Sequence, residues 1–191
     1  MSGCGCFTLR SFAPFAVKRT ARFRPHHSAG ERRVYLWEGK QVDIARWLHV
    51  TGVVVWVGGM FFAYMALRPA AAKLLEPAQR LPLWSATFTN FFPWVWVAVW
   101  LILPSGAYLF VLMGGFAGAP RHANIMFALG LVMIWIFGHV YYSSFRKLKR
   151  HVALKDWPQA GAALNQIRVL VGANLLLGLL TIAVATAGRL L

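Results

Sequence analysis

Hydrophobic residues gather in long runs along this chain, and polar residues are concentrated in the stretches between the runs. Each run is close to the ~20 residues that a helix needs to cross ~30 Å of hydrocarbon. Helix is expected because lipid offers no hydrogen-bond partner to backbone N–H and C=O groups. The pattern therefore predicts an all-α, integral membrane four-helix bundle. Its helices are expected at about residues 44–67, 92–113, 123–145 and 169–187.

The stretches between these runs complete the expected organisation. Residues 1–40 are expected to form a basic, disordered N-terminal tail, and residues 41–191 the membrane domain. The tail is rich in Arg and poor in acids, as transit peptides are, and a basic cytoplasmic tail is the alternative. Residues 70–91 are expected to lie along the membrane interface. Residues 146–168 are expected to form a polar, mostly basic linker.

Composition supports the membrane class and narrows the partners. The 191 residues are 59% hydrophobic and 13% charged, whereas about a quarter of a globular chain is charged. Lys and Arg number 20 against 5 Asp and Glu, and the basic residues lie outside the interiors of the apolar runs. Membrane lipid is therefore the expected partner, and nucleic acid is not.

The orientation across the membrane has two solutions. The basic linker at residues 146–168 lies close to the membrane, which favours placing it in the cytoplasm. If the basic N-terminal tail is itself retained in the cytoplasm, the assignment reverses.

The acidic residues exclude one kind of chemistry. All of them lie outside the interiors of the apolar runs, so no catalytic carboxylate pair and no acidic proton relay is expected in the membrane. No enzyme activity is predicted from these residues. Histidines do occur in the runs, and burying an ionisable side chain in a membrane is costly. A membrane histidine is therefore a candidate functional residue.

Two predicted helices carry a histidine near the start and a methionine eleven residues later. At 100° per residue, His49 and Met60 share one face of the first helix. His122, Met126 and Met133 share one face of the third. Both helices run in the same direction, so the two histidines are expected at the same membrane face. The paired methionines are then ~16 Å deeper.

Two kinds of site fit these His–Met stripes, and packing is the alternative to both. Imidazole and thioether groups suit copper as Cu(I), with His49, Met60, His122, Met126 and Met133 as ligands. Alternatively, His49 and His122 are the axial ligands of a b-type haem. In the third interpretation the methionines pack and the protein is a non-catalytic accessory subunit of a larger membrane complex.

The first predicted helix also resembles that of a known family. In WLHVTGVVVWVGGMFFAYMALRPA, a histidine is followed by Trp-x-Gly-Gly and then by Arg-Pro at the helix end. The residues that carry this pattern are His49, Trp56, Gly58, Gly59, Arg68 and Pro69. The pattern resembles the CopD-type copper resistance membrane proteins, and the similarity continues over about residues 43–189.

This resemblance implies a short, four-helix form of the family in the bacterial inner membrane. The implied role is copper transport or tolerance, with a periplasmic copper protein or a larger membrane complex as partner. The first helix is also similar, more weakly, to that of the HemJ-type membrane proteins, which are associated with haem. Those proteins carry an essential lysine in a later helix, and residues 123–145 contain none.

Overall fold

The computed structural model describes residues 29–188, with side chains described from residue 39 onward. The chain divides into two units, Met1–Leu36 and Trp37–Leu191. Of the first unit, residues 29–36 are described, and they are helical although they belong to the predicted disordered tail. The rest of that predicted tail, residues 1–28, lies outside the described residues.

The described part of the chain consists of helices and contains no strand. In chain order its elements are α1 (Ala29–Phe62), the π-helical turn η1 (Ala63–Leu67), α2 (Arg68–Leu74), α3 (Pro77–Leu112), α4 (Gly115–Gly118), α5 (Arg121–His139), the π-helical turn η2 (Val140–Phe145), α6 (Arg146–Ala153) and α7 (Trp157–Ala187). Several of these elements are continuous with one another.

The described chain therefore contains four long helical rods, Gly39–Leu74, Pro77–Leu112, Arg121–Ala153 and Trp157–Ala187. Each rod is long and apolar enough to cross a membrane. The predicted all-α membrane architecture is confirmed.

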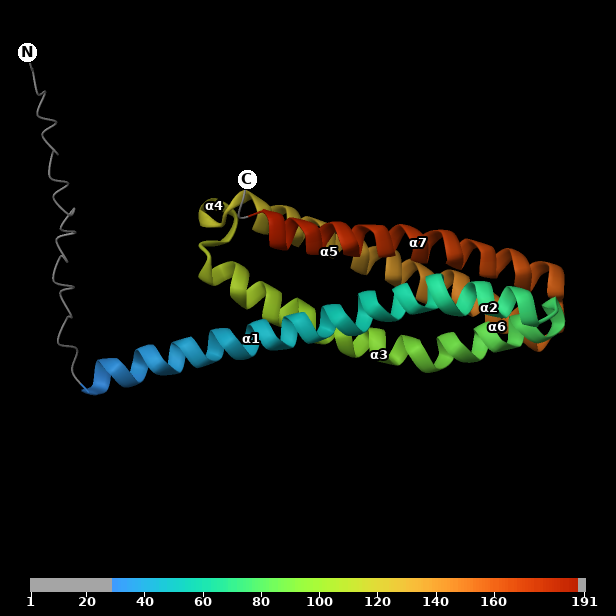
Figure 1. The fold of residues 1–191 in the computed structure, drawn as a ribbon, viewed down its shortest axis with the longest axis horizontal. Coiled ribbons are helices and arrows are strands. Elements are labelled where there is room, and N and C mark those ends of the chain that lie inside the picture. The colour runs from blue at the N-terminus through green and yellow to red at the C-terminus, as the bar shows by residue number, and fades with distance from the viewer. Residues whose placement is uncertain (1–28, 189–191) are drawn as a thin grey trace, which may run out of the picture. The chain divides into compact units, whose positions relative to one another are not determined.

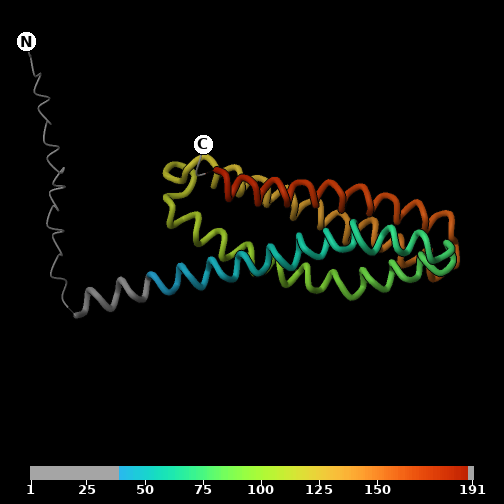
Figure 2. The backbone as a smooth tube through the Cα atoms, in the orientation of Figure 1, coloured from blue at the N-terminus to red at the C-terminus, as the bar shows by residue number. Residues whose placement is uncertain are grey.

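The rods of the second unit lie side by side along a common direction (Figure 1). Figure 2 shows the chain reversing direction between successive rods. Helices α2 and α6 lie at one end of the bundle, together with the starts of α3 and α7, and we call this the α2–α6 end. The opposite end holds α4, the start of α5 and the last turn of α7, and we call it the α4 end (Figure 1).

The rods are longer than the apolar runs that predict them. The segment 70–91, expected along the interface, is instead the end of α2 and the first turns of α3. The expected linker 146–168 is helical apart from the turn between α6 and α7. The reason is burial, because Trp84 is 3% exposed and Leu148 is fully buried. Packing between rods therefore stabilises these helical extensions.

Aromatic side chains form the centre of the core. The Phe92 ring centroid lies 4.9 Å from that of Phe145, 5.1 Å from Phe88 and 5.6 Å from Phe137. Trp56 joins from α1, with its ring centroid 5.8 Å from that of Phe137. Aromatic pairs at separations of ~4.5–7 Å attract beyond their burial alone. This cluster connects α1, α3, α5 and η2.

Large apolar side chains also cover the outside of the rods. Trp47, Trp100, Trp135 and Leu176 are each about two-thirds or more exposed. In water such surfaces would mark binding sites or aggregation hazards, whereas in a bilayer they contact acyl chains. Membrane lipid is therefore the environment of this bundle.

Candidate functional site

His49 of α1 contacts α3. Its Nδ1 lies 3.2 Å from the Ile102 carbonyl oxygen and 3.3 Å from Ser105 Oγ. A carbonyl oxygen can only accept a hydrogen bond, so the Ile102 contact requires a proton on Nδ1. The neutral ring then keeps its lone pair on Nε2, which leaves that nitrogen available to a metal ion.

Gly106 permits this close approach of α1 to α3. A methyl group at Gly106 would lie 2.8 Å from His49 Cε1 and 3.1 Å from Nδ1. Any larger residue there would displace the imidazole ring. The Ser105 hydroxyl also has a fixed orientation, because it donates a hydrogen bond to the carbonyl oxygen of Leu101, one helical turn earlier in α3. The local structure of α3 thus holds the ring of His49 in one direction.

Met60 is buried in the bundle and contacts a polar residue of α7. Its Sδ accepts a hydrogen bond from Asn174 Nδ2 at 3.8 Å. Asn174 is 3% exposed, and its Oδ1 has no hydrogen-bond partner among the described residues. Leaving such a group unsatisfied costs ~1–3 kcal/mol. Sequence reasoning left Asn174 out of the site, although a buried amide within an apolar run is a signal that could have included it.

Met133 approaches the same part of α7 from α5. It is buried, and a methyl group at Gly178 would lie 3.2 Å from its Cε and 2.9 Å from Val57 Cγ2. Gly178 follows Asn174 by one helical turn, about 6 Å along α7. Met60 and Met133, one from each predicted stripe, therefore converge on one short stretch of α7.

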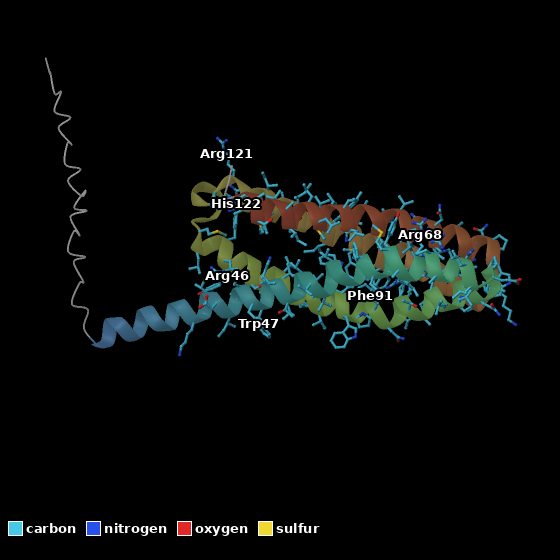
Figure 3. All side chains as sticks on the ribbon, viewed as in Figure 1. Arg46, Trp47, Arg68, Phe91, Arg121 and His122 are labelled. Carbon is cyan, nitrogen blue, oxygen red and sulfur yellow. The ribbon has the colours of Figure 1, made fainter. Side chains whose placement is uncertain are left out.

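His122 lies at the α4 end, against the last turn of α7. A methyl group at Gly188 would lie 2.5 Å from His122 Cβ. Met126 is half-buried, one turn further along α5. Figure 3 shows His122 well apart from Trp47, which precedes His49 by two residues on α1. Within the described residues, no hydrogen bond joins the two histidines.

The described residues contain no group of three or more His, Cys, Asp and Glu side chains that could hold a metal ion. A metal site in this bundle would therefore depend on thioether sulfurs and single imidazoles. That ligand set favours a soft ion over a hard one. Haem ligation by His49 and His122 would require both rings to reach one iron, and it stays a prediction.

An apolar cavity of about 250 Å³ lies beside Met60. The rods of α1, α3, α5 and α7 all contribute to its walls, which include Trp56, Gly59, Phe137 and Asn174. Sites for small molecules usually have volumes of ~300–1,000 Å³. The cavity is therefore suited to a slender apolar group.

Comparison with known proteins identifies the family. No curated protein and no solved structure matches the chain. The family described as Copper resistance protein D, CopD, matches residues 85–187. The matched range includes His122, Met126 and Met133, whereas His49 and Met60 precede it. Because this match covers more than half of the chain, the protein belongs to the CopD family of copper resistance proteins, and its four apolar rods make it a multi-pass membrane protein.

Proposed function

We propose that this protein handles copper as Cu(I) within the membrane, in transport or tolerance, with Met60 and Met133 as thioether ligands at the centre of the bundle. The convergence of both methionines on α7 at Asn174 and Gly178 carries this proposal. Soft thioether ligands select Cu(I). Membership of the CopD family supports copper as the cargo.

His49, His122 and Met126 are the proposed ligands nearer the α4 end. A metal-ligating histidine usually donates its second ring N–H to a carbonyl or carboxylate, as His49 Nδ1 can donate to Ile102. Each histidine lies ~16 Å along its helix from the methionine of the same stripe. The proposed path for Cu(I) therefore leads from the imidazoles at the α4 end to the thioethers in the interior.

The distribution of acids supports a soft cargo over a hard one. Among the described side chains the acids are Asp43, Glu76 and Asp156, and all three lie near the ends of the rods. Hard divalent cations such as Mg²⁺ and Ca²⁺ are bound mainly through oxygen ligands, with carboxylates prominent among them. Cu(I) needs no carboxylate and tolerates an apolar, sulfur-lined interior.

We place the protein in the bacterial inner membrane with its α2–α6 end in the cytoplasm. Within the described rods, this end carries the larger group of basic residues, Arg68, Lys73, Arg80, Arg146, Lys147, Lys149, Arg150, Lys155 and Arg168. The α4 end carries Lys40, Arg46 and Arg121. Positive charge near the membrane favours the cytoplasmic side. The two histidines would then face the periplasm, where a periplasmic copper protein would deliver the ion.

Competition for Cu(I) tests the proposal on the purified protein in detergent. The protein is mixed under reducing, anaerobic conditions with Cu(I)-bicinchoninate, whose absorbance reports how much copper leaves the chelator. Loss of a residue that only supports a metal ligand typically weakens metal affinity by roughly 10–100-fold. We expect Met60→Leu and Met133→Leu, which remove proposed ligands, to weaken Cu(I) binding by at least that much. Met65→Leu is the matched control, because Met65 belongs to the same rod and is 55% exposed.

Two results would contradict copper handling. One is a wild-type protein that leaves all Cu(I) on the chelator, and the other is a pair of interior variants that bind as tightly as Met65→Leu. The visible spectrum before and after dithionite tests the haem alternative. A Soret band with sharp α and β bands on reduction, lost in His49→Ala, would establish haem binding in place of copper.

A further inference from the structure

Three arginines from three different helices come together at the α2–α6 end. Arg68 begins α2, Arg80 lies in the first turns of α3, and Arg168 lies in α7. The charges of Arg68 and Arg80 both act on Arg168. Figure 3 shows Arg68 at this end of the bundle. Holding like charges close together is unfavourable unless an anion offsets their repulsion.

Tyr64 of η1 holds part of this cluster against α7. The Arg68 guanidinium carbon lies 4.9 Å from the centroid of the Tyr64 ring, which is a cation–π contact. A methyl group at Gly172 would lie 3.1 Å from Tyr64 Cε2 and 3.3 Å from its hydroxyl oxygen. Gly172 follows Arg168 by one helical turn. The Arg68–Tyr64 pair is therefore seated beside the helix that carries Arg168.

The cluster has unused hydrogen-bonding capacity. Among the described residues, none of the three arginines forms an ion pair with an acid. The Nε atoms of Arg80 and Arg168 are buried and have no hydrogen-bond partner there. Asp156 is the N-cap residue immediately before α7, and its carboxylate lies 3.3 Å from His151 Nδ1 instead. A buried guanidinium N–H without an acceptor is costly, so an acceptor from outside the described chain is expected for the two Nε atoms.

The apolar cavity extends toward the end of the bundle that carries these arginines. Its walls include Leu67, the residue before Arg68, and Leu170, two residues after Arg168. From there it reaches inward to Met60. Its volume of about 250 Å³ is below the ~300 Å³ of the smaller small-molecule sites and suits a single hydrocarbon chain. Cationic groups and an apolar cavity therefore lie in the same part of the bundle, as an anionic amphiphile requires.

We propose that Arg68, Arg80 and Arg168 bind the phosphate of an anionic phospholipid, one acyl chain of which enters the apolar cavity. The planar guanidinium group matches phosphate oxygens and binds them through paired hydrogen bonds. Basic pockets between membrane helices are a recognised type of site for anionic lipid headgroups. The phosphate supplies the acceptors that the Nε atoms of Arg80 and Arg168 lack.

Lipid titration of the purified full chain in a neutral detergent tests this site. Phosphatidylglycerol is compared with phosphatidylcholine of the same acyl chains and with inorganic phosphate, using native mass spectrometry for affinity and thermal unfolding for stabilisation. We expect phosphatidylglycerol to bind most tightly and to raise the melting temperature most. Each arginine is expected to contribute about five-fold in affinity, so Arg80→Gln with Arg168→Gln should lose roughly 25-fold.

Lys147→Gln with Arg150→Gln is the matched control, because it removes the same charge from exposed positions of α6 at the same end. An equal loss of affinity in this control would overturn the site in favour of general surface attraction. Stabilisation by inorganic phosphate as strong as that by phosphatidylglycerol would overturn the lipid assignment.

A second double variant, which keeps the positive charges, tests the site even if the glutamine variant does not fold. Arg80→Lys with Arg168→Lys preserves the positive charges but loses the planar fork that grips phosphate. Loss of most of the preference for phosphatidylglycerol would support the guanidinium site. An unchanged preference would overturn it.

Discussion

Substituting alanine for Gly59 of α1 is expected to destabilise the bundle, whereas the same change at the adjacent Gly58 is not. A methyl group at Gly59 would lie 2.3 Å from Phe91 Cζ and 2.4 Å from Phe91 Cε2, while one at Gly58 would meet nothing within 4 Å. Ordinary contact begins at 3.4 Å, so the Phe91 ring would have to retreat by about 1 Å. Side chains on a helix have few alternative rotamers into which they can retreat.

The expected magnitudes follow from two opposing effects. Alanine favours a helix over glycine by about 0.8–1.0 kcal/mol, and both variants gain this stabilisation. Forcing an extra methyl group into a packed contact typically costs about 1–3 kcal/mol, and only Gly59→Ala incurs that cost. The helix preference cancels when the two variants are compared. Gly59→Ala should therefore unfold with a free energy about 1–3 kcal/mol lower than Gly58→Ala.

Unfolding in mixed micelles provides the measurement. The protein in mild detergent is titrated with sodium dodecyl sulfate, and tryptophan fluorescence and far-ultraviolet circular dichroism report the free energy of unfolding. Gly58→Ala is expected at or slightly above the wild type. Equal stabilities for the two variants would refute the reasoning, because they would show that Phe91 does not pack on Gly59.

Three further predictions concern the core, the buried amide and the orientation. Phe92→Ala should lower the free energy of unfolding by about 3–5 kcal/mol. Trp100 is 73% exposed, so Trp100→Ala should change that free energy by about 0.5 kcal/mol or less. Similar losses in the two variants would contradict a core centred on Phe92. Asn174→Leu should leave that free energy unchanged or raise it by up to about 2 kcal/mol, because removing the unpartnered Oδ1 offsets the loss of the long N–H···S contact with Met60; a clear loss would mean that Oδ1 has a partner or that the contact with Met60 is strongly stabilising. In a background with both native cysteines replaced by serine, Lys155→Cys should resist a membrane-impermeant maleimide in intact cells and Ala119→Cys should react; the opposite pattern would invert the orientation.

Hydropathy predicts the membrane rods but not their ends. The thickness of the hydrocarbon core sets the length of each apolar run, so the four runs can be recognised from hydropathy along the sequence. The first turns of α3 and all of α6 lie beyond those runs, and contacts with neighbouring rods stabilise them through Trp84 and Leu148. Such contacts link residues far apart in the sequence, and a local pattern does not report them.

The candidate site was predictable to a similar extent. Helical periodicity indicates that His49 and Met60 share a face, and Met60 does face the interior. Periodicity gives a direction around one helix axis, but it does not say which neighbouring helix lies there. His49 meets α3 because Gly106 leaves room for its ring, and His122 meets α7 beside Gly188. The partners of the two histidines therefore depend on helix packing.

The π-helical turn η1 determines which way the end of the first rod faces. A π-turn accommodates one more residue than an α-turn, so the residues after Leu67 are rotated about the axis by roughly 100° relative to an unbroken α-helix. In an unbroken helix, Arg68 would lie about 80° around from the inward-facing Met60, and with η1 it lies within about 20° of it. The π-helical turn therefore places Arg68 on the side of the rod that faces the bundle. Deleting one residue from Ala63–Leu67 would therefore restore ordinary α-helical turns and leave Arg68 on the same face, again about 20° around from Met60.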